Sequence, residues 1–124
     1  MANILLLEPD LILGKTYSKY LESLGHNLNW QQSAQAAVQA LDNFQAQLAI
    51  IELQIAGHNG LEFLYEIRSY PDLQTLPVII QSVVGKSTLQ PNVMEQLQIN
   101  AYLHKPSTSL AQLGEVVSSA ARSS

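Results

Sequence analysis

The feature that most constrains the fold is a repeated alternation of short apolar runs with segments of helical periodicity. A continuous apolar run such as residues 4–7 is typical of a strand buried on both faces of a parallel sheet. Each run is followed by a segment in which apolar residues recur at helical spacing. The alternation predicts right-handed strand–helix–strand units and a parallel sheet covered on both faces. The predicted strands lie at residues 4–7, 28–30, 48–53, 78–80 and 101–104.

Capping signals mark the predicted helices. Asp10 and Ser33 precede two of the helical segments and are residue types that favour N-capping, and Gly25 suits the end of the first helix. A fourth helix is predicted at residues 91–97, where a proline stands near the start. The length of the chain fits one hydrophobic core, so we expect residues 1–124 to form a single domain with no effector domain after the last helix.

Composition narrows the possible functions. The chain has no cysteine, which excludes a disulfide framework, a thiolate metal site and cysteine catalysis. Its net charge is −4 with only six Lys plus Arg, so we expect no nucleic-acid partner, because binding phosphates requires clustered cations. The N-terminal apolar run is far shorter than the ~18 residues that span a bilayer. We therefore expect no membrane segment and a cytoplasmic location.

Four polar residues stand where predicted strands end. Glu8 follows the first strand, Glu52 lies near the end of the third, Ser82 follows the fourth and Lys105 follows the fifth. The carboxyl ends of parallel strands meet at one edge of the sheet, where ligands of such folds bind. We therefore expect two acids, a hydroxyl and a lysine to converge there.

This ordered set resembles the receiver domain of two-component response regulators over essentially the whole chain. Residues 8–10 are similar to the family's acidic motif, and residues 102–106 resemble its closing motif. Residues 52–60 resemble its phosphoacceptor loop, with Glu52 at the position of the phosphoacceptor aspartate. The resemblance implies a three-layer α/β/α sandwich with a flavodoxin-like, five-stranded parallel sheet of strand order 2-1-3-4-5. It also implies a signalling module that is not an enzyme.

The resemblance assigns a role to each matching residue. In the family, an aspartate takes a phosphoryl group, and a hydroxyl and a lysine contact the phosphoryl oxygens. By position, Ser82 would be the switch hydroxyl, Tyr102 the aromatic that moves between buried and exposed positions, and Lys105 the cation. We expect Lys105 to form an ion pair with Glu52. The resemblance further implies a cis peptide bond before Pro106.

The metal site of the family is only partly present. The resemblance implies Glu8, Glu52 and the backbone of Gln54 as candidate ligands for Mg²⁺. Pro9 stands where the family has a second metal-binding acid, and its side chain offers no ligand oxygen. Asp10 could substitute, although it is better suited to capping the helix. Because Mg²⁺ demands near-ideal octahedral geometry, we expect its binding to be weak or absent.

Two further departures affect the phosphoacceptor. The carboxylate of Glu52 extends about 1.5 Å farther than that of an aspartate, and misplacement on the order of 1 Å can cost about 100-fold in rate. Val83, after the switch hydroxyl, is larger than the small residue common in the family, so we expect it to crowd the site. Ala56 stands where the family often has proline, which matters less.

Our leading hypothesis is therefore a degenerate receiver, or pseudo-receiver, that acts as a phosphorylation-independent protein interaction module. Its partner would be a histidine kinase or another signalling protein, bound at the fourth helix, fifth strand and last helix, where a homodimer could also form. The main alternative is a working phosphoacceptor that uses Mg²⁺. Glu52 could also mimic the phosphorylated state. A flavodoxin-like binder of a small ligand is disfavoured, because no glycine-rich phosphate loop follows the first strand.

Overall fold

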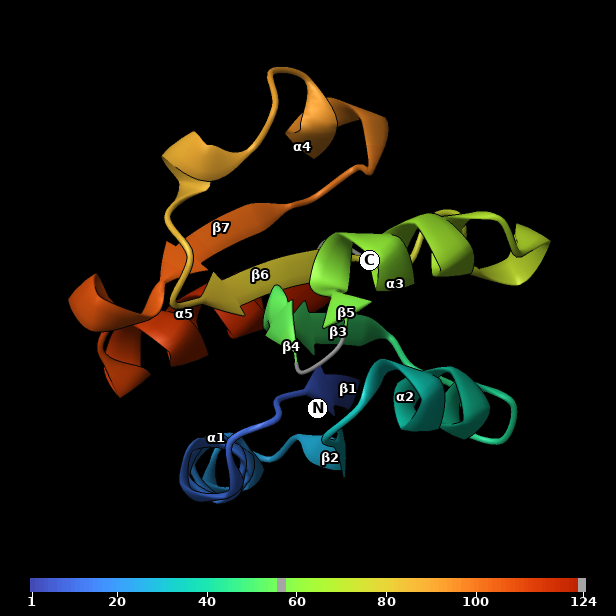
Figure 1. Cartoon of the computed structure of the whole chain (residues 1–124). Coiled ribbons are helices and arrows are strands. Elements are labelled where there is room, and N and C mark those ends of the chain that lie inside the picture. The colour runs from blue at the N-terminus through green and yellow to red at the C-terminus, as the bar shows by residue number, and fades with distance from the viewer. Residues whose placement is uncertain (56–57, 123–124) are drawn as a thin grey trace.

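The main sheet consists of five parallel strands. A computed structural model describes residues 1–55 and 58–122. The sheet order is β2-β1-β3-β6-β7, and every neighbouring pair is parallel (Figure 1). Numbered along the chain among themselves, these five strands have the order 2-1-3-4-5, so the predicted topology is confirmed. Their bounds are β1 Asn3–Leu7, β2 Asn27–Gln31, β3 Leu48–Ile51, β6 Val78–Ser82 and β7 Ala101–His104.

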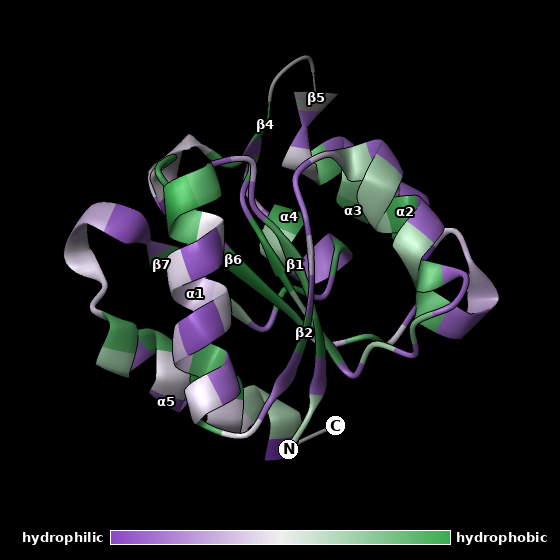
Figure 2. Ribbon diagram, turned by 90° about the horizontal axis from the view of Figure 1, so that it is seen from below, coloured by the Kyte–Doolittle hydropathy of each residue, from purple (hydrophilic) through white to green (hydrophobic). Residues whose placement is uncertain are grey.

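Helices cover both faces of the sheet, as the ribbon views show (Figures 1 and 2). One face packs against α1 (Leu11–Ser23) and α5 (Leu110–Arg122). The other packs against α2 (Ala34–Leu41), α3 (Gly60–Arg68) and the short α4 (Val93–Gln96). This arrangement is the expected three-layer sandwich. Across the described residues, we find no helix whose length and apolar content would let it cross a bilayer.

The strand β1 illustrates how the sequence builds the two cores. Side chains alternate across a strand, so Ile4 and Leu6 join the core under α1 and α5, whereas Leu5 and Leu7 join the core under α2 and α3. All four side chains are fully or almost fully buried. Each buried aliphatic side chain contributes about 1.5–3 kcal/mol, which explains why this run has no polar position.

The predicted capping residues are confirmed. The Asp10 side chain accepts a hydrogen bond from the Leu13 N–H at 2.9 Å, and the Ser33 hydroxyl accepts one from the Ala36 N–H at 3.1 Å. Gly25 follows α1 with a φ of +96°, a left-handed conformation that glycine adopts at little cost. These local signals fix where α1 and α2 begin and where α1 ends.

The structure differs from the prediction in two segments. A two-stranded antiparallel ribbon, β4 (Gln54–Ile55) with β5 (His58–Asn59), follows β3 and was not predicted. The positions Ala56 and Gly57 lie outside the described residues. The fourth helix is confined to Val93–Gln96, because Asn92 has a left-handed φ of +74° and helical geometry begins only after it.

The expected cis bond before Pro106 is wrong. The described residues contain no cis peptide bond, so the Lys105–Pro106 bond is trans. Pro106 lies in the first turn of the 3-10 helix η3 (Lys105–Ser107). A trans proline fits there, because its ring fixes a helix-compatible φ and its missing N–H has no acceptor to lose in a first turn.

Candidate functional site

The polar residues at the strand ends converge around one lysine. The Lys105 Nζ lies 2.6 Å from Glu8 Oε1 and 2.6 Å from Glu52 Oε1. The hydroxyl of Ser82 donates a hydrogen bond to Glu52 Oε2. Only 2% of Glu8, 3% of Glu52 and none of Ser82 is exposed. The structure thus brings together two acids, one cation and one hydroxyl in a buried cluster at the carboxyl edge of the sheet.

The carboxylate of Glu52 receives four hydrogen bonds. Its Oε1 accepts from Lys105 Nζ at 2.6 Å and from the Val83 N–H at 3.1 Å. Its Oε2 accepts from the Ser82 hydroxyl and from the Gln54 N–H at 3.0 Å. An ionised carboxylate offers about four lone-pair sites. The hydrogen-bonding capacity of this carboxylate is therefore filled by the protein itself.

The backbone beneath Glu52 is held by the start of α3. The Gly60 N–H donates to the Leu53 carbonyl at 2.8 Å. A Cβ on Gly60 would lie 2.7 Å from both the Glu52 carbonyl oxygen and the Leu53 Cα, so only glycine permits this close approach. The Asn59 side chain caps α3 by accepting from the Leu61 N–H at 2.8 Å. These contacts fix the direction in which the Glu52 side chain leaves β3.

Glu8 is anchored from both sides. Its Oε2 accepts a hydrogen bond from the Asp10 N–H at 3.0 Å, while its backbone carbonyl accepts one from Trp30 Nε1 at 2.9 Å. Asp10 directs its own carboxylate to the Leu13 N–H instead of to Lys105. The acidic pocket is thus formed by Glu8 and Glu52, and Asp10 caps the amino end of α1.

Two side chains of β7 contact the backbone of the segment that follows β6. The Tyr102 hydroxyl donates to the Val84 carbonyl at 2.5 Å, and His104 Nε2 lies 3.0 Å from the Val83 carbonyl. The Ser82 hydroxyl also accepts from the Val84 N–H at 3.0 Å. Tyr102 is therefore directed inward and fixes this segment beside Glu52. Sequence reasoning missed His104, although its spacing of two from Tyr102 on one strand places both on the same face.

The cluster favours ionised Glu52 and protonated Lys105. Burial alone would raise the pKa of Glu52, but hydrogen bonds from Gln54, Lys105 and Ser82, together with the lysine charge, lower it below its ordinary value. Burial alone would lower the pKa of Lys105, but the hydrogen bonds and negative charges of Glu52 and Glu8 raise it. The two groups stabilise each other's charged forms.

Glu8 behaves differently, although it contacts the same lysine. Burial raises its pKa and outweighs the hydrogen bonds from Lys105 and Asp10, and the nearby charge of Glu52 adds to the rise. The pKa of Tyr102 is also raised, mainly by burial and also by the charge of Glu52. Glu8 is therefore the acid of the cluster that takes up a proton most readily.

The residues present fit a Mg²⁺ ion poorly. Within residues 1–55 and 58–122, no three or more His, Asp or Glu side chains are placed to hold a metal ion. The ammonium group of Lys105 lies between the two carboxylates that a metal would need. Pro9 provides no side-chain ligand. The cationic position of this pocket is thus filled by a side chain.

Val83 lies at the rim of the cluster. Its side chain is 47% exposed, while its backbone N–H points inward to Glu52. Sequence reasoning considered only the size of this side chain and missed the donor. Any residue except proline supplies a backbone N–H, so no side-chain pattern could have revealed it.

Comparison with known proteins identifies the class of protein that this fold and site define. Residues 4–118 match the response regulator receiver domain family, and the chain belongs to that family. Receiver domains are signalling modules of two-component systems; they interact with histidine kinases or other signalling proteins and can bind Mg²⁺ at an acidic pocket.

Individual relatives support this assignment. The chain is 32% identical over 104 residues to the swarming motility regulation protein RssB of Serratia marcescens, covering 84% of this chain and 46% of that protein. It is 27% identical over 106 residues to the probable transcriptional regulator ycf29 of Cyanophora paradoxa, covering 86% of this chain and 50% of that protein. The chain thus spans about half the length of these relatives.

Solved structures show the same fold. A CheY-like receiver domain from Methylobacillus flagellatus superposes with a TM-score of 0.83 at 23% identity, covering 97% of this chain and 98% of that one. A sensor protein from Polaromonas sp. JS666 gives a TM-score of 0.90 at 17% identity, covering 98% and 97% respectively. The architecture is retained although few residues are shared.

Proposed function

We propose that this chain is a degenerate receiver that acts in two-component signalling as a phosphorylation-independent protein interaction module. The observation that carries the proposal is the saturated carboxylate of Glu52, which accepts four hydrogen bonds from the protein itself, the one from Lys105 also being an ion pair. A nucleophilic oxygen must present a free lone pair to the incoming phosphorus. Attack by Glu52 would first require breaking the contact with Lys105 or one of the other donors.

Glu52 then takes over part of the phosphoryl group's role. Its carboxylate reaches Ser82 and Lys105, the residue types that contact phosphoryl oxygens in the family. It carries one negative charge, whereas a phosphoryl group adds about −1.5 to −2. With Tyr102 bonded to the segment after β6, the site is held in one arrangement and needs no phosphorylation to form. Regulation would come from partner binding.

The proposed interaction surface comprises α4, β7 and α5. Among the strands that the structure describes, β7 lies at the edge of the sheet, pairs only with β6 and has four half-buried residues. An edge strand offers unpaired backbone groups and partly exposed side chains to another protein. The partner would be a histidine kinase, another signalling protein or a second copy of this chain. A net charge of −4 favours a protein partner over nucleic acid.

Incubation with acetyl phosphate and Mg²⁺, followed by intact-mass measurement, tests the proposal. We expect no phosphate-sized gain for the unmodified chain. The variant Pro9→Asp/Glu52→Asp, which restores both acids typical of the family, is the matched control and should gain one. A gain in the unmodified chain that is lost in Glu52→Ala would show a working phosphoacceptor and refute the proposal.

A further inference from the structure

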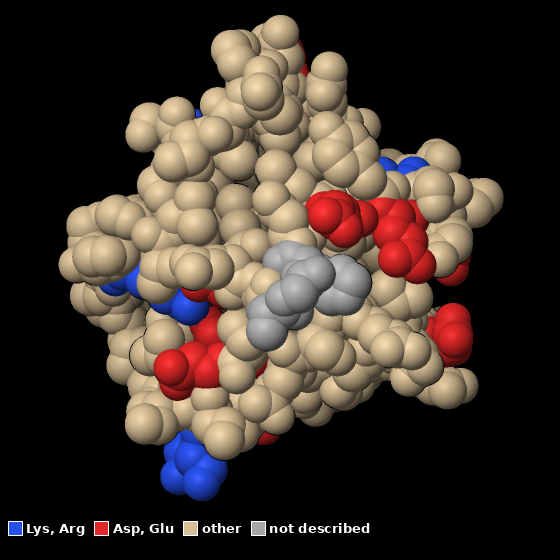
Figure 3. Space-filling model, in the orientation of Figure 1, with Lys and Arg blue, Asp and Glu red and all other residues tan. Residues whose placement is uncertain are grey.

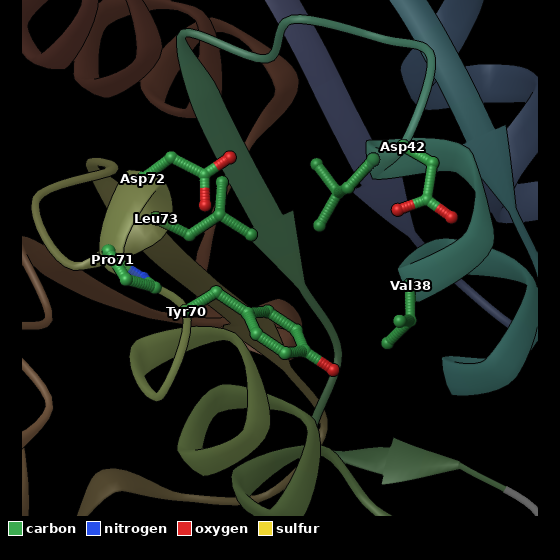
Figure 4. A pocket seen from close by; sticks show the side chains of 7 residues that line it. Val38, Asp42, Tyr70, Pro71, Asp72 and Leu73 are labelled. Atoms are coloured by element: carbon green, nitrogen blue, oxygen red, sulfur yellow. The ribbon is translucent and has the colours of Figure 1, made fainter.

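A second concave site lies between α2 and η1 (Pro71–Leu73), on the same side of the sheet as α3 (Figure 4). Its volume is about 380 Å³. Figure 4 shows Val38 and Asp42 on the wall formed by α2, Asp72 and Leu73 on the wall formed by η1, and Tyr70 reaching between them. The site therefore combines an apolar floor with a carboxylate on each side.

The concavity continues along the amino-terminal edge of the sheet. A neighbouring cavity of about 510 Å³ shares Asp72 and Leu73 with the first. Its other lining residues lie just before β3 and β6, namely Ala46, Gln47, Thr75, Leu76 and Pro77. In a parallel sheet this edge is opposite the carboxyl ends that carry Glu52. We call the two cavities together the α2–η1 groove; two adjoining cavities that share Asp72 and Leu73 suit a chain segment better than a single small molecule.

The two carboxylates of the groove, those of Asp42 and Asp72, are exposed, and the ion pairs found among the described residues do not include them. Asp42 follows the last residue of α2, where the helix dipole disfavours a negative charge. Its position is thus slightly unfavourable for the isolated fold.

Tyr70 is held in place in the groove by a hydrogen bond. Its hydroxyl donates to Glu66 Oε2 at 2.8 Å, while 38% of its surface remains exposed. The same hydrogen bond raises the pKa of Tyr70, and the negative charges of Glu66 and Asp42 add to the rise. A fixed, exposed aromatic ring surrounded by negative charge is a favourable surface for an arginine or lysine side chain.

Acids outnumber bases on this side of the molecule, where α2, α3, η1 and the residues that cap them carry Asp42, Glu62, Glu66 and Asp72. Arg68, the single base among α2, α3, η1 and the residues that cap them, donates to the backbone carbonyls of Leu73, Leu97 and Gln98 at 2.7, 2.9 and 3.2 Å. Lys15, Lys19 and Arg122 lie on α1 and α5, which cover the other face. Figure 3 shows acidic side chains gathered over this side, with basic atoms at their margin. Arg68 keeps its positive charge while it donates to neutral carbonyls, so it offsets part of the negative charge beside the groove, and the remaining negative charge can attract an external cation.

We propose that the α2–η1 groove binds a segment of a partner protein in which lysine or arginine stands next to an apolar side chain. The apolar side chain packs on Val38, Leu41 and Leu73, and the basic groups pair with Asp42 and Asp72 while lying against the Tyr70 ring. The carboxylates would repel nucleic acid and anionic membranes. This site does not depend on the state of Glu52.

Fluorescence anisotropy with two synthetic peptides tests the inference. The first is a labelled nine-residue peptide with two arginines flanking a central leucine, and the second has glutamates in place of the arginines. We expect the arginine peptide to bind the whole chain at low salt and the glutamate peptide to fail. Asp42→Asn and Asp72→Asn should each weaken binding about two- to fivefold, as expected for exposed ion pairs. Serine in place of the leucine should also weaken binding.

Matched variants separate the groove from overall charge. Glu22→Gln and Glu115→Gln remove equal charge from exposed positions of α1 and α5 and should leave peptide affinity unchanged. The charge-reversed variant Asp42→Arg/Asp72→Arg should lose the arginine peptide and bind the glutamate peptide. Thermal melting of each variant checks folding, and amide NMR shifts on adding peptide should concentrate at Val38 and Leu73.

Three results would overturn the inference. One is equal affinity of the arginine peptide for the unmodified chain and for Asp42→Asn/Asp72→Asn. Another is no binding of that peptide at concentrations approaching the millimolar range. The third is a concentration-dependent dimer, seen by sedimentation, that disappears in Asp42→Asn/Asp72→Asn, which would assign the groove to a second copy. None of these measurements involves phosphorylation, so a failure of the groove inference leaves the proposed function standing. A phosphate gain in the acetyl phosphate test would likewise leave the groove inference standing.

Discussion

The two edges of the sheet use carboxylates in opposite ways. At the carboxyl edge, Glu8 and Glu52 are almost fully buried and both contact Lys105 at 2.6 Å. At the amino edge, Asp42 and Asp72 are exposed and take part in none of the ion pairs found among the described residues. The first pair determines how the chain itself is arranged, and the second is available to an outside molecule.

Burial explains the difference. Removing a carboxylate from water is costly unless a partner compensates, so the buried cluster must satisfy its charges internally. A carboxylate that stays in water keeps its hydration and can exchange it for a ligand at modest cost. On the proposal that this receiver takes up no phosphoryl group, the buried cluster gives it a stable polar centre while other surfaces carry its interactions.

The largest effect is expected from removing the shared cation. Lys105→Met leaves two buried carboxylates without their counterion, and such a loss costs about 3–5 kcal/mol of unfolding free energy. Urea unfolding at neutral pH measures it. Lys86→Met, at an exposed position in η2 (Lys86–Thr88), is the matched control and should change stability by less than about 0.5 kcal/mol. Equal effects of the two variants would contradict the view that Lys105 compensates buried charge.

Glu52→Gln should have the next largest effect, about 1–3 kcal/mol at neutral pH, because charge-assisted hydrogen bonds are lost. The pKa of Glu52 is lower in the folded chain than its ordinary value of 4.5, so its contribution is present above that value. It disappears as the pH falls through the lowered pKa of the folded state. The unmodified chain and the variant should therefore converge in stability at acidic pH. A difference that stays constant with pH would contradict this assignment.

Glu8→Gln should have a smaller effect, about 1 kcal/mol, with the opposite pH dependence. The pKa of Glu8 is raised above 4.5 in the folded chain, so the folded state binds its proton more tightly than the unfolded state. Relative to Glu8→Gln, the unmodified chain should lose stability as the pH rises from 4.5 through the raised pKa. Paired urea titrations across this range test it, and parallel curves for Glu8→Gln and Glu52→Gln would refute the asymmetry.

Most of the site at the carboxyl edge could be predicted from the sequence, because the alternation of apolar runs with helical segments determines where the strands end. Apolar runs locate the strands, and the residues after them, such as Glu52 and Lys105, must then converge. The backbone donors of Gln54 and Val83 could not be predicted, because every residue except proline has an N–H and only the chain path selects which one is used. The trans bond before Pro106 likewise depends on the local turn of η3.

The amino edge was not predicted at all. Asp42 and Asp72 lie in connecting segments with no periodic pattern, and they are 30 positions apart in the sequence. They face one groove only because α2 and η1 pack on the same side of the sheet. The ribbon β4–β5 was missed for a related reason, since two-residue strands are too short to show alternation.

The smallest change in unfolding free energy is expected at the amino edge. Measuring it tests the contrast between the two edges directly. Asp42→Asn/Asp72→Asn should change the unfolding free energy by no more than about 0.5 kcal/mol, because neither carboxylate compensates a charge inside the fold. Any shift should be toward greater stability, since Asp42 at the end of α2 opposes the helix dipole, and added salt should remove that gain. Urea unfolding at low and high salt measures both. A loss comparable to that of Glu52→Gln would mean that these carboxylates hold the fold together, and the contrast between the two edges would fail.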